Sequence, residues 1–203
     1  MKKALFLGRV LTLAVVVAAI ISKSAAAHPV SAPVDTSWCT NPLLSQPFLG
    51  HRDDHEYMLL PGESPGNFDG TGWTLSRGAS IVTTTLENGN SGSVLDLPSG
   101  AVAVSPTVCV TSDYPDARSM VRDVAGPGGI SFAVSYQGRR SWDVPKHAGK
   151  LHGDKGAWTV SHPLGVHPRA TAGWQPVRFV LTGEGDASDS QVYDLYVDPR
   201  MKH

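Results

Sequence analysis

Short runs of apolar, β-branched and aromatic residues recur along most of the chain, separated by clusters of Gly, Pro, Asn and Asp. After residue 27 there is almost no stretch with the 3.6-residue period of an amphipathic helix. Runs of this length and composition, bounded by turn residues, are typical of β-strands. The runs expected to form strands are 57–60, 73–75, 79–86, 93–97, 101–104, 108–111, 118–124, 130–136, 157–160, 175–181 and 191–197.

The clearest alternation lies in residues 130–136, where Phe132, Val134 and Tyr136 are separated by the smaller residues Ser and Ala. A period of two places the large side chains on one face, as in a half-buried antiparallel strand. A parallel sheet would need crossover helices, and the sequence contains no pattern for them. The sequence therefore predicts an all-β fold, an antiparallel β-sandwich of the jelly-roll type.

The N-terminus has the three parts of a secretory signal peptide: a basic start, an apolar stretch over 10–21, and small residues that end at Ala27. Arg9 and Lys23 limit the apolar stretch to fewer than the roughly 20 residues that a membrane-spanning helix needs. We therefore expect residues 1–27 to be a signal peptide. The mature protein should be secreted, extracellular and not inserted in a membrane.

The mature chain divides into a leader and one domain. Residues 28–38 contain two prolines and several small residues, which predicts a flexible leader. Residues 39–200 are long enough for a single β-sandwich domain with its own core. The whole chain has a net charge of −1, but the signal peptide is basic, so the mature charge is about −5. This excess of acid argues against nucleic acid as a partner, because binding to phosphates needs a basic face.

Cys39 and Cys109 are the two cysteines of the chain. An even pair in an exported protein predicts a disulfide. It would close a loop of about 70 residues and stabilise the fold by about 4 kcal/mol. A thiolate nucleophile or a zinc site would require a nearby His or a second Cys pair, which the sequence does not show.

Three stretches, at 39–82 (from Cys39 through Phe48 and Asp53 or Asp54), 93–110 and 192–199, carry a resemblance that covers nearly all of residues 39–200. In this order they resemble a family of secreted proteins from high-GC Gram-positive bacteria that has no established activity. The opening Asn-Phe-Asp-Gly with Gly-Trp-Thr, and the closing Tyr-Asp-Leu-Tyr-Val, are similar to the terminal strands of carbohydrate-binding modules with a galactose-binding-like jelly roll. This second resemblance implies a glycan or a cell-surface component as the partner.

Similar modules often hold a structural calcium between their terminal strands. The resemblance places its acids at Asp69 and Asp194 in this chain. Calcium binds about six to eight oxygens, many of them backbone carbonyls, so two distant acids could suffice. The family usually has two successive acids in the last strand, and here Tyr193 stands in place of the first. The alternative is that both acids lie at strand ends in solvent.

Histidines and acids give no recognised catalytic or metal motif. His147, His152, His162 and His167 lie in or near the polar stretch 137–156, which we expect to be a loop, and their spacing matches no zinc motif. The cluster at 51–56 contains two His and three acids and could supply an acid–base pair for catalysis. Solvent-exposed loops without a catalytic role often have the same composition. No Gly-x-Ser-x-Gly motif precedes a helix.

Aromatic side chains supply the remaining candidate contacts, because their rings pack on the apolar faces of sugars. Trp73 and Trp158 lie in expected strands and should be in the core, whereas Trp142 lies in the polar stretch. We therefore predict Trp142, with Tyr136 before it, as ligand contacts. The sequence favours a secreted, non-catalytic protein that binds a glycan or a cell-surface component. A hydrolase with its site in 137–167 and a structural envelope protein remain alternatives.

Overall fold

The computed structural model describes residues 34–111, 116–166 and 173–198. The predicted signal peptide, the first part of the predicted leader and the last residues of the predicted domain lie outside these ranges. In the described residues the regular structure is β apart from one 3-10 turn, η1 (Leu49–His51). None of their helical structure is long and apolar enough to cross a membrane.

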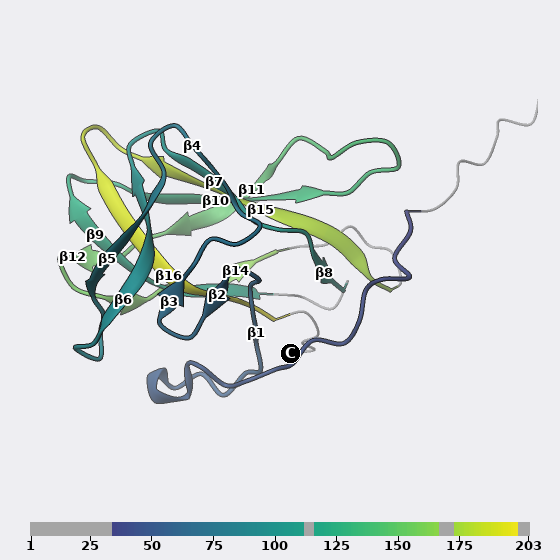
Figure 1. Ribbon diagram of the computed structural model, residues 1–203, viewed down its shortest axis with the longest axis horizontal. Coiled ribbons are helices and arrows are strands. Elements are labelled where there is room, and N and C mark those ends of the chain that lie inside the picture. The colour runs from purple at the N-terminus through teal and green to yellow at the C-terminus, as the bar shows by residue number, and fades with distance from the viewer. Residues whose placement is uncertain (1–33, 112–115, 167–172, 199–203) are drawn as a thin grey trace, which may run out of the picture. The chain divides into compact units, whose positions relative to one another are not determined.

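The larger main sheet has eight strands (Figure 1). Its central path is β12 (Asp154–Lys155), β9 (Asp116–Ala125), β16 (Asp189–Val197), β6 (Ser91–Pro98) and β5 (Ser80–Thr85). Three short strands are added to this path: β1 (Met58–Leu59) on β16, and both β13 (Thr159–Val160) and β14 (Leu164–Gly165) on β9. Within this sheet the pairs are antiparallel, except for the parallel pair of β12 with β9.

The smaller main sheet has six strands. Its path is β11 (Lys146–Leu151), β10 (Gly129–Tyr136), β15 (Gln175–Glu184), β7 (Val102–Val104) and β4 (Thr74–Ser76), with β8 (Val108–Val110) also paired to β15. A separate hairpin is formed by β2 (Glu63–Ser64) and β3 (Asn67–Phe68). The longest pairing in the smaller sheet is that of β10 with β15, which extends along the whole of β10.

Strands that follow one another in the sequence occupy matching positions in the two main sheets. The pairs are β4–β5, β6–β7, β9–β10, β11–β12 and β15–β16, and the two members of each pair lie in different sheets. A chain that winds back and forth between two sheets in this way forms a jelly roll. The predicted all-β, antiparallel jelly-roll sandwich is confirmed.

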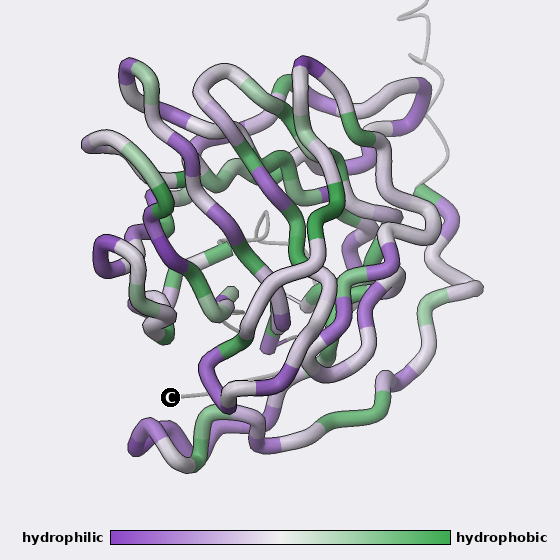
Figure 2. Tube along the Cα trace, turned by 60° about the vertical axis from the view of Figure 1, so that its left-hand side comes forward, coloured by the Kyte–Doolittle hydropathy of each residue, from purple (hydrophilic) through white to green (hydrophobic). Residues whose placement is uncertain are grey.

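Inward side chains of both sheets fill the space between them. Phe132 of β10 and Phe179 of β15 stack with their ring centroids 5.1 Å apart, and Leu95 of β6 is fully buried in the same cluster. Phe132, Val134 and Tyr136 are all buried, which confirms the predicted alternation in 130–136. Figure 2 shows apolar and polar positions following one another along the strands.

The polar stretch 137–156 differs from the prediction of a loop, because it contains β11 and β12. β11 pairs antiparallel with β10, with a register shift between Phe132 and Ala133. β11 is the last strand on its side of the sheet path, and an edge strand tolerates charged and small residues that weaken the apolar alternation. β11 therefore forms because it pairs with β10, and its own sequence of apolar and polar residues does not predict a strand.

Residues 45–57, which we call the strap, cover part of the outer face of the larger sheet. The Phe48 ring meets Tyr57 at 5.4 Å and Tyr196 of β16 at 5.5 Å, both edge to face. These rings form a second hydrophobic cluster with Met120 and Tyr193 from the sheet. The larger sheet is therefore apolar on both faces where the strap crosses it.

A buried ion pair fastens the strap to β9. Asp53 is 7% exposed, and its Oδ2 accepts hydrogen bonds from the Tyr57 hydroxyl at 2.8 Å and from Arg118. Its Oδ1 accepts one from the backbone N–H of His55 at 3.1 Å. Burial acts to raise the pKa of Asp53, but the hydrogen bonds from Tyr57, Arg118 and His55 outweigh it and hold the pKa below its ordinary value.

The predicted disulfide between Cys39 and Cys109 is confirmed, with the two Cα atoms 5.8 Å apart. It joins the chain before the strap to β8, which pairs with β15 in the smaller sheet. The strap is thus anchored twice: to the larger sheet through Asp53 and, through the chain that precedes it, to the smaller sheet. A disulfide is also typical of exported proteins.

Replacement of both cysteines, Cys39→Ser with Cys109→Ser, should lower the free energy of unfolding by about 4 kcal/mol. The unfolded chain then regains the entropy of a loop that spans a sequence separation of 70. Urea denaturation measures the difference. The exposed neighbour Thr40 offers a control, because Thr40→Ser should leave the free energy unchanged. A loss below about 1 kcal/mol would show that the bridge does not constrain the fold.

Asp53→Asn should lower the free energy of unfolding by about 3 kcal/mol near pH 7, because it leaves Arg118 without its buried partner. The pKa of Asp53 is lowered in the fold, so its contribution is present above the unfolded pKa and is lost as the pH falls through the folded value. Denaturation of wild type and variant from about pH 7 to about pH 3 should therefore show a shrinking difference. Asp54→Asn, at the exposed neighbour, is the control. A difference independent of pH would argue against an ionised Asp53.

Candidate functional site

Part of the outer face of the six-stranded sheet is built from short side chains. Ala133 of β10, Val180 of β15 and Val104 of β7 lie opposite one another in one row across the sheet. Ser131 and Thr182 begin the next row. All five residues are half-buried, whereas their inward-facing neighbours on these strands are fully buried. These side chains are small, of mixed polarity and partly exposed.

Trp142 lies beside this face, in the turn between β10 and β11. The turn is closed by an isolated bridge between Gln137 and Trp142 and by a 2.8 Å hydrogen bond from Gly138 N–H to the carbonyl of Ser141. The Arg178 guanidinium of β15 lies 4.2 Å from the centroid of the half-buried Trp142 ring. Arg178 Nε donates to Thr107 Oγ1 at 3.2 Å, so the cation that supports the ring is itself held in place.

Hydrogen-bonding groups from β11 border the same face. Ser131 Oγ and His147 Nδ1 are 3.2 Å apart, and Lys150 Nζ is 3.3 Å from Glu184 Oε2. The face therefore combines one positioned aromatic ring with hydroxyl, imidazole and charged groups. Such a combination can pack against an apolar ligand surface while it exchanges hydrogen bonds with hydroxyl groups.

Tyr136, the second predicted ligand contact, lies elsewhere. It is 3% exposed in the core between the sheets, and its hydroxyl donates to the Val166 carbonyl at 2.7 Å. The ring belongs to the inward face of β10, as the alternation of that strand indicates. The prediction that Tyr136 contacts a ligand is wrong, because a buried ring cannot stack on an external molecule.

The other described tryptophans occupy different environments. Trp73 is buried, with its Nε1–H donated to the Pro61 carbonyl, and Trp158 packs edge to face on Tyr193. Trp73 therefore lies in the core as predicted, whereas Trp158 is half-buried and packs against the second hydrophobic cluster. Trp38, in the leader, is 47% exposed.

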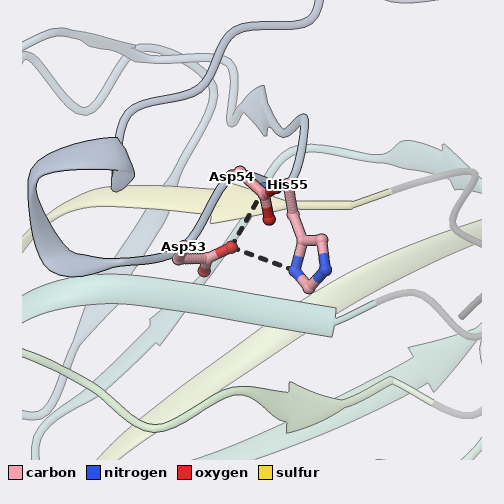
Figure 3. A group of neighbouring side chains, drawn as sticks. All are labelled: Asp53, Asp54 and His55. Atoms are coloured by element: carbon pink, nitrogen blue, oxygen red, sulfur yellow. Dashed lines mark hydrogen bonds and ion pairs between the residues drawn. The ribbon is translucent and has the colours of Figure 1, made fainter.

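Asp53, Asp54 and His55, three residues of the polar cluster at 51–56, form the group in Figure 3. Possible ligand atoms of Asp53, Asp54 and His55 lie within 4.8 Å of one another, and His55 Nδ1 is 3.0 Å from Asp53 Oδ1. These three residues could hold a metal ion. Asp53, however, already binds Arg118, and the positive charge of a guanidinium disfavours a second cation at the same carboxylate. The contacts assign this group to the attachment of the strap.

The other histidines singled out from the sequence make no comparable group. In the part of the chain that the structure describes, Asp53, Asp54 and His55 are the one set of three acidic, His or Cys side chains with ligand atoms this close. His147 lies on the outer face of the smaller sheet, whereas His152 and His162 follow β11 and β13. His167 lies outside the described residues.

A third acid, Glu63, lies near the predicted calcium ligands Asp69 and Asp194. The sequence analysis did not single it out. Asp194 occupies a bulge of β16 with a left-handed backbone, φ 52°, and its Oδ1 accepts the Gly66 N–H at 2.7 Å. Glu63 of β2 approaches the same bulge, where its Oε2 accepts the Leu195 N–H at 3.1 Å. Asp69 is exposed and accepts the Thr71 N–H at 2.6 Å.

The Glu63 carboxylate is an unusual buried acid. Residue 63 as a whole is half-buried, but its Oε1 is inaccessible to solvent and has no hydrogen-bond partner among the described residues. Burial raises the pKa of Glu63 well above its ordinary value, and the charges of Asp194 and Asp69 add to the shift. Burial likewise raises the pKa of Asp194. Two acids are therefore held together here at an electrostatic cost.

Comparison with known proteins finds similar folds but no similar sequence: the chain matches no protein-family profile and no curated protein. One similar structure holds the CBM22-1 and GH10 modules of Clostridium thermocellum endo-1,4-β-D-xylanase 10B, complexed with xylohexaose. It is 14% identical over 64% of this chain and 26% of that chain, with a TM-score of 0.49.

Two further similar structures are single modules. One is a family 16 carbohydrate-binding module, 13% identical over 69% of this chain and 98% of that one, with a TM-score of 0.46. The other is TmCBM61 in complex with β-1,4-galactotriose, 12% identical over 70% and 98%, with a TM-score of 0.39. At these identities the similarity concerns the fold alone, and none of it bears on the resemblance to secreted proteins of high-GC Gram-positive bacteria.

Proposed function

We propose that this chain is a secreted, non-catalytic β-sandwich protein that binds an extracellular glycan or a glycan-bearing cell-surface component. The binding site in this proposal is the outer face of the six-stranded sheet. The observation that carries it is the placement of Trp142, which Arg178 supports from one face at the border of a surface of short side chains. The ring face opposite Arg178 can then stack on a sugar ring.

The neighbouring groups suit hydroxylated ligands. Sugar hydroxyls both donate and accept hydrogen bonds, and Ser131, Thr182 and His147 offer side chains that can do the same. Lys150 is paired with the carboxylate of Glu184, whereas Arg178 donates to the neutral hydroxyl of Thr107 and keeps its positive charge.

Trp142→Ala should weaken binding of a glycan by at least about tenfold, or about 1.4 kcal/mol, because it removes the stacking surface. A glycan array identifies the ligand, and isothermal titration measures the affinity of wild type and variant. Trp38→Ala is the matched control: it removes an exposed tryptophan from the leader and should leave the affinity unchanged.

Two outcomes would contradict the proposal. No binding to any glycan, with or without a chelator, would contradict glycan binding as the function. Equal affinity of Trp142→Ala and wild type would contradict the location of the site on the outer face of the six-stranded sheet. Release of reducing ends from the bound oligosaccharide would instead favour the rival hydrolase hypothesis.

We also propose that a structural calcium ion binds beside the β16 bulge, near Glu63 and Asp194, with Asp69 adding its charge from nearby. These three acids do not converge as closely as Asp53, Asp54 and His55, so backbone carbonyls would supply further ligands. The donor set fits a hard cation, since carboxylate and backbone oxygens are the ligands of calcium. The buried Glu63 Oε1 lacks a hydrogen-bond partner, and no basic side chain contributes to the pKa shifts of Glu63 or Asp194 in the described residues. A bound ion would neutralise these charges and stabilise the attachment of the β2–β3 hairpin to β16.

Calcium at roughly a hundredfold above its Kd should raise the Tm of wild type by about 5–10 °C. Glu63→Gln should abolish this response, whereas Glu56→Gln, at an exposed acid of the strap, should keep it. Thermal unfolding in calcium and in chelator measures both effects.

The pH dependence in chelator gives a second readout. Because the pKa of Glu63 is raised in the fold, its favourable contribution is present at low pH and is lost as the pH rises through the folded value. Metal-free wild type should therefore lose stability relative to Glu63→Gln as the pH rises above the ordinary carboxyl range toward the raised folded pKa of Glu63. The same Tm in calcium and in chelator would contradict the calcium site and leave the glycan proposal intact.

A further inference from the structure

Positive charge is concentrated around the face proposed as the glycan surface. β10, the turn after it, β11 and β15 together contain five Lys or Arg residues and two acids. This part of the chain therefore has a net charge of +3 with His neutral, whereas the whole chain has −1. A local excess of one sign attracts ligands of the opposite sign. The five basic residues are Arg139, Arg140, Lys146, Lys150 and Arg178.

The two acids of this region leave most of the positive charge unpaired. Glu184 pairs with Lys150 at 3.3 Å. Asp143 lies in the turn, where its backbone N–H donates to the Tyr136 carbonyl at 2.9 Å. The other four basic residues make no ion pair with any acid that the structure describes. The accessible charge of this face is therefore predominantly positive.

Arg178 is the basic group that the fold positions best. Its Nε donates to Thr107 Oγ1 at 3.2 Å, and its guanidinium lies 4.2 Å from the centroid of the Trp142 ring. Its partner across β10 is Ser135, so a short side chain stands beside it. Within the described residues, its two terminal nitrogens have no hydrogen-bond acceptor. A planar guanidinium of this kind matches a planar carboxylate, to which it can donate two parallel hydrogen bonds.

The turn between β10 and β11 adds charge beside the same ring. Arg139 and Arg140 form its exposed tip and come just before Trp142 in the chain. Val144 of the same turn is 83% exposed. The turn therefore presents two unpaired guanidinium groups together with apolar surface.

Basic groups also flank the strip of short side chains along β10. His147 of β11 lies opposite Ala133, and Lys150 of β11 lies opposite Ser131. Arg178 stands on the other side of the strip, in β15. Neighbouring strands are about 4.8 Å apart, so β11 and β15 are separated by about 10 Å across β10. A chain of sugars that lies over the strip can thus reach basic groups on both sides.

We infer that this face binds an acidic polysaccharide whose sugars carry carboxylate groups. The inference rests on the proposed glycan function and narrows it to one class of ligand. A sugar ring packs on Trp142, and its carboxylate interacts with Arg178 or with the Arg139–Arg140 tip. Double-stranded DNA, with one charge per about 1.7 Å, would need a denser basic surface than these spaced groups provide.

The test compares sugar chains that differ in the carboxylate alone. One pair of probes is oligogalacturonate and its methyl ester, and the other is a hyaluronan oligosaccharide and its carboxyl-reduced form. Isothermal titration of the mature protein should show the acid of at least one pair bound at least about tenfold more tightly than its neutral partner. Added salt should weaken binding of the acid and leave the neutral partner unchanged, since only the acid is held by charge.

Variants locate the charge that the carboxylate meets. Arg178→Gln, and separately Arg139→Gln with Arg140→Gln, should lower the ratio of acid to neutral affinity by about threefold or more. The ratio is measured because a loss of support for Trp142 would weaken both members of a pair alike. Arg178→Lys, which keeps the charge, should retain more of the ratio than Arg178→Gln. Lys155→Gln, at an exposed residue of β12 in the other sheet, is the matched control and should leave the ratio unchanged.

Equal affinities within both pairs would overturn the inference, as would an unchanged ratio in both arginine variants. Binding of a neutral glycan with no binding of either acid would also overturn it, and would leave the proposed function intact. Dextran sulfate is titrated as a sulfated probe, and tighter binding of it than of either acid would overturn the assignment to carboxylates. No binding to any glycan, acidic or neutral, would contradict the proposed function itself.

Discussion

The bulge at Asp194 and Leu195 is the constraint on which the arrangement of the larger sheet depends. It interrupts the pairing of β16 with β9 between Tyr193 and Tyr196, so both tyrosines reach the outer face of the sheet while Leu195 reaches the core. An extra residue in one strand is the ordinary cause of such a change of phase. The strap packs on Tyr196. The β2–β3 hairpin binds the bulge through two hydrogen bonds: the Glu63 carboxylate accepts the Leu195 N–H, and the Gly66 N–H donates to the Asp194 carboxylate.

The two outer faces of the sandwich consequently differ. On the larger sheet, the second hydrophobic cluster requires a cover, and the strap supplies it through Phe48 and through the ion pair of Asp53 with Arg118. On the smaller sheet, short side chains such as Ala133 and Val180 need no cover, and Trp142 lies at their border. The proposed glycan surface therefore lies on the smaller sheet, away from the outer face that the strap covers.

Local patterns predicted the fold well, because the strands between the sheets must alternate to fill one core. Residues 130–136 are the clearest case, and their alternation also places Tyr136 inward, which its assignment as a ligand contact overlooked. β11 escaped prediction since its residues are held by pairing with β10 rather than by an apolar pattern. The role of Glu63 was not predicted for a different reason. The Leu195 N–H that it binds is 132 residues away in the sequence, and only the folded chain brings the two together.

The most direct test of the central claim, that the outer face of the smaller sheet is the glycan surface, is amide chemical-shift mapping. The isotope-labelled mature protein is titrated with the oligosaccharide that binds best on an array. The account predicts shifts concentrated around Ser131, Trp142 and Arg178, with the strap unaffected. Shifts centred on the strap and β16, or no oligosaccharide that produces any shift, would contradict it.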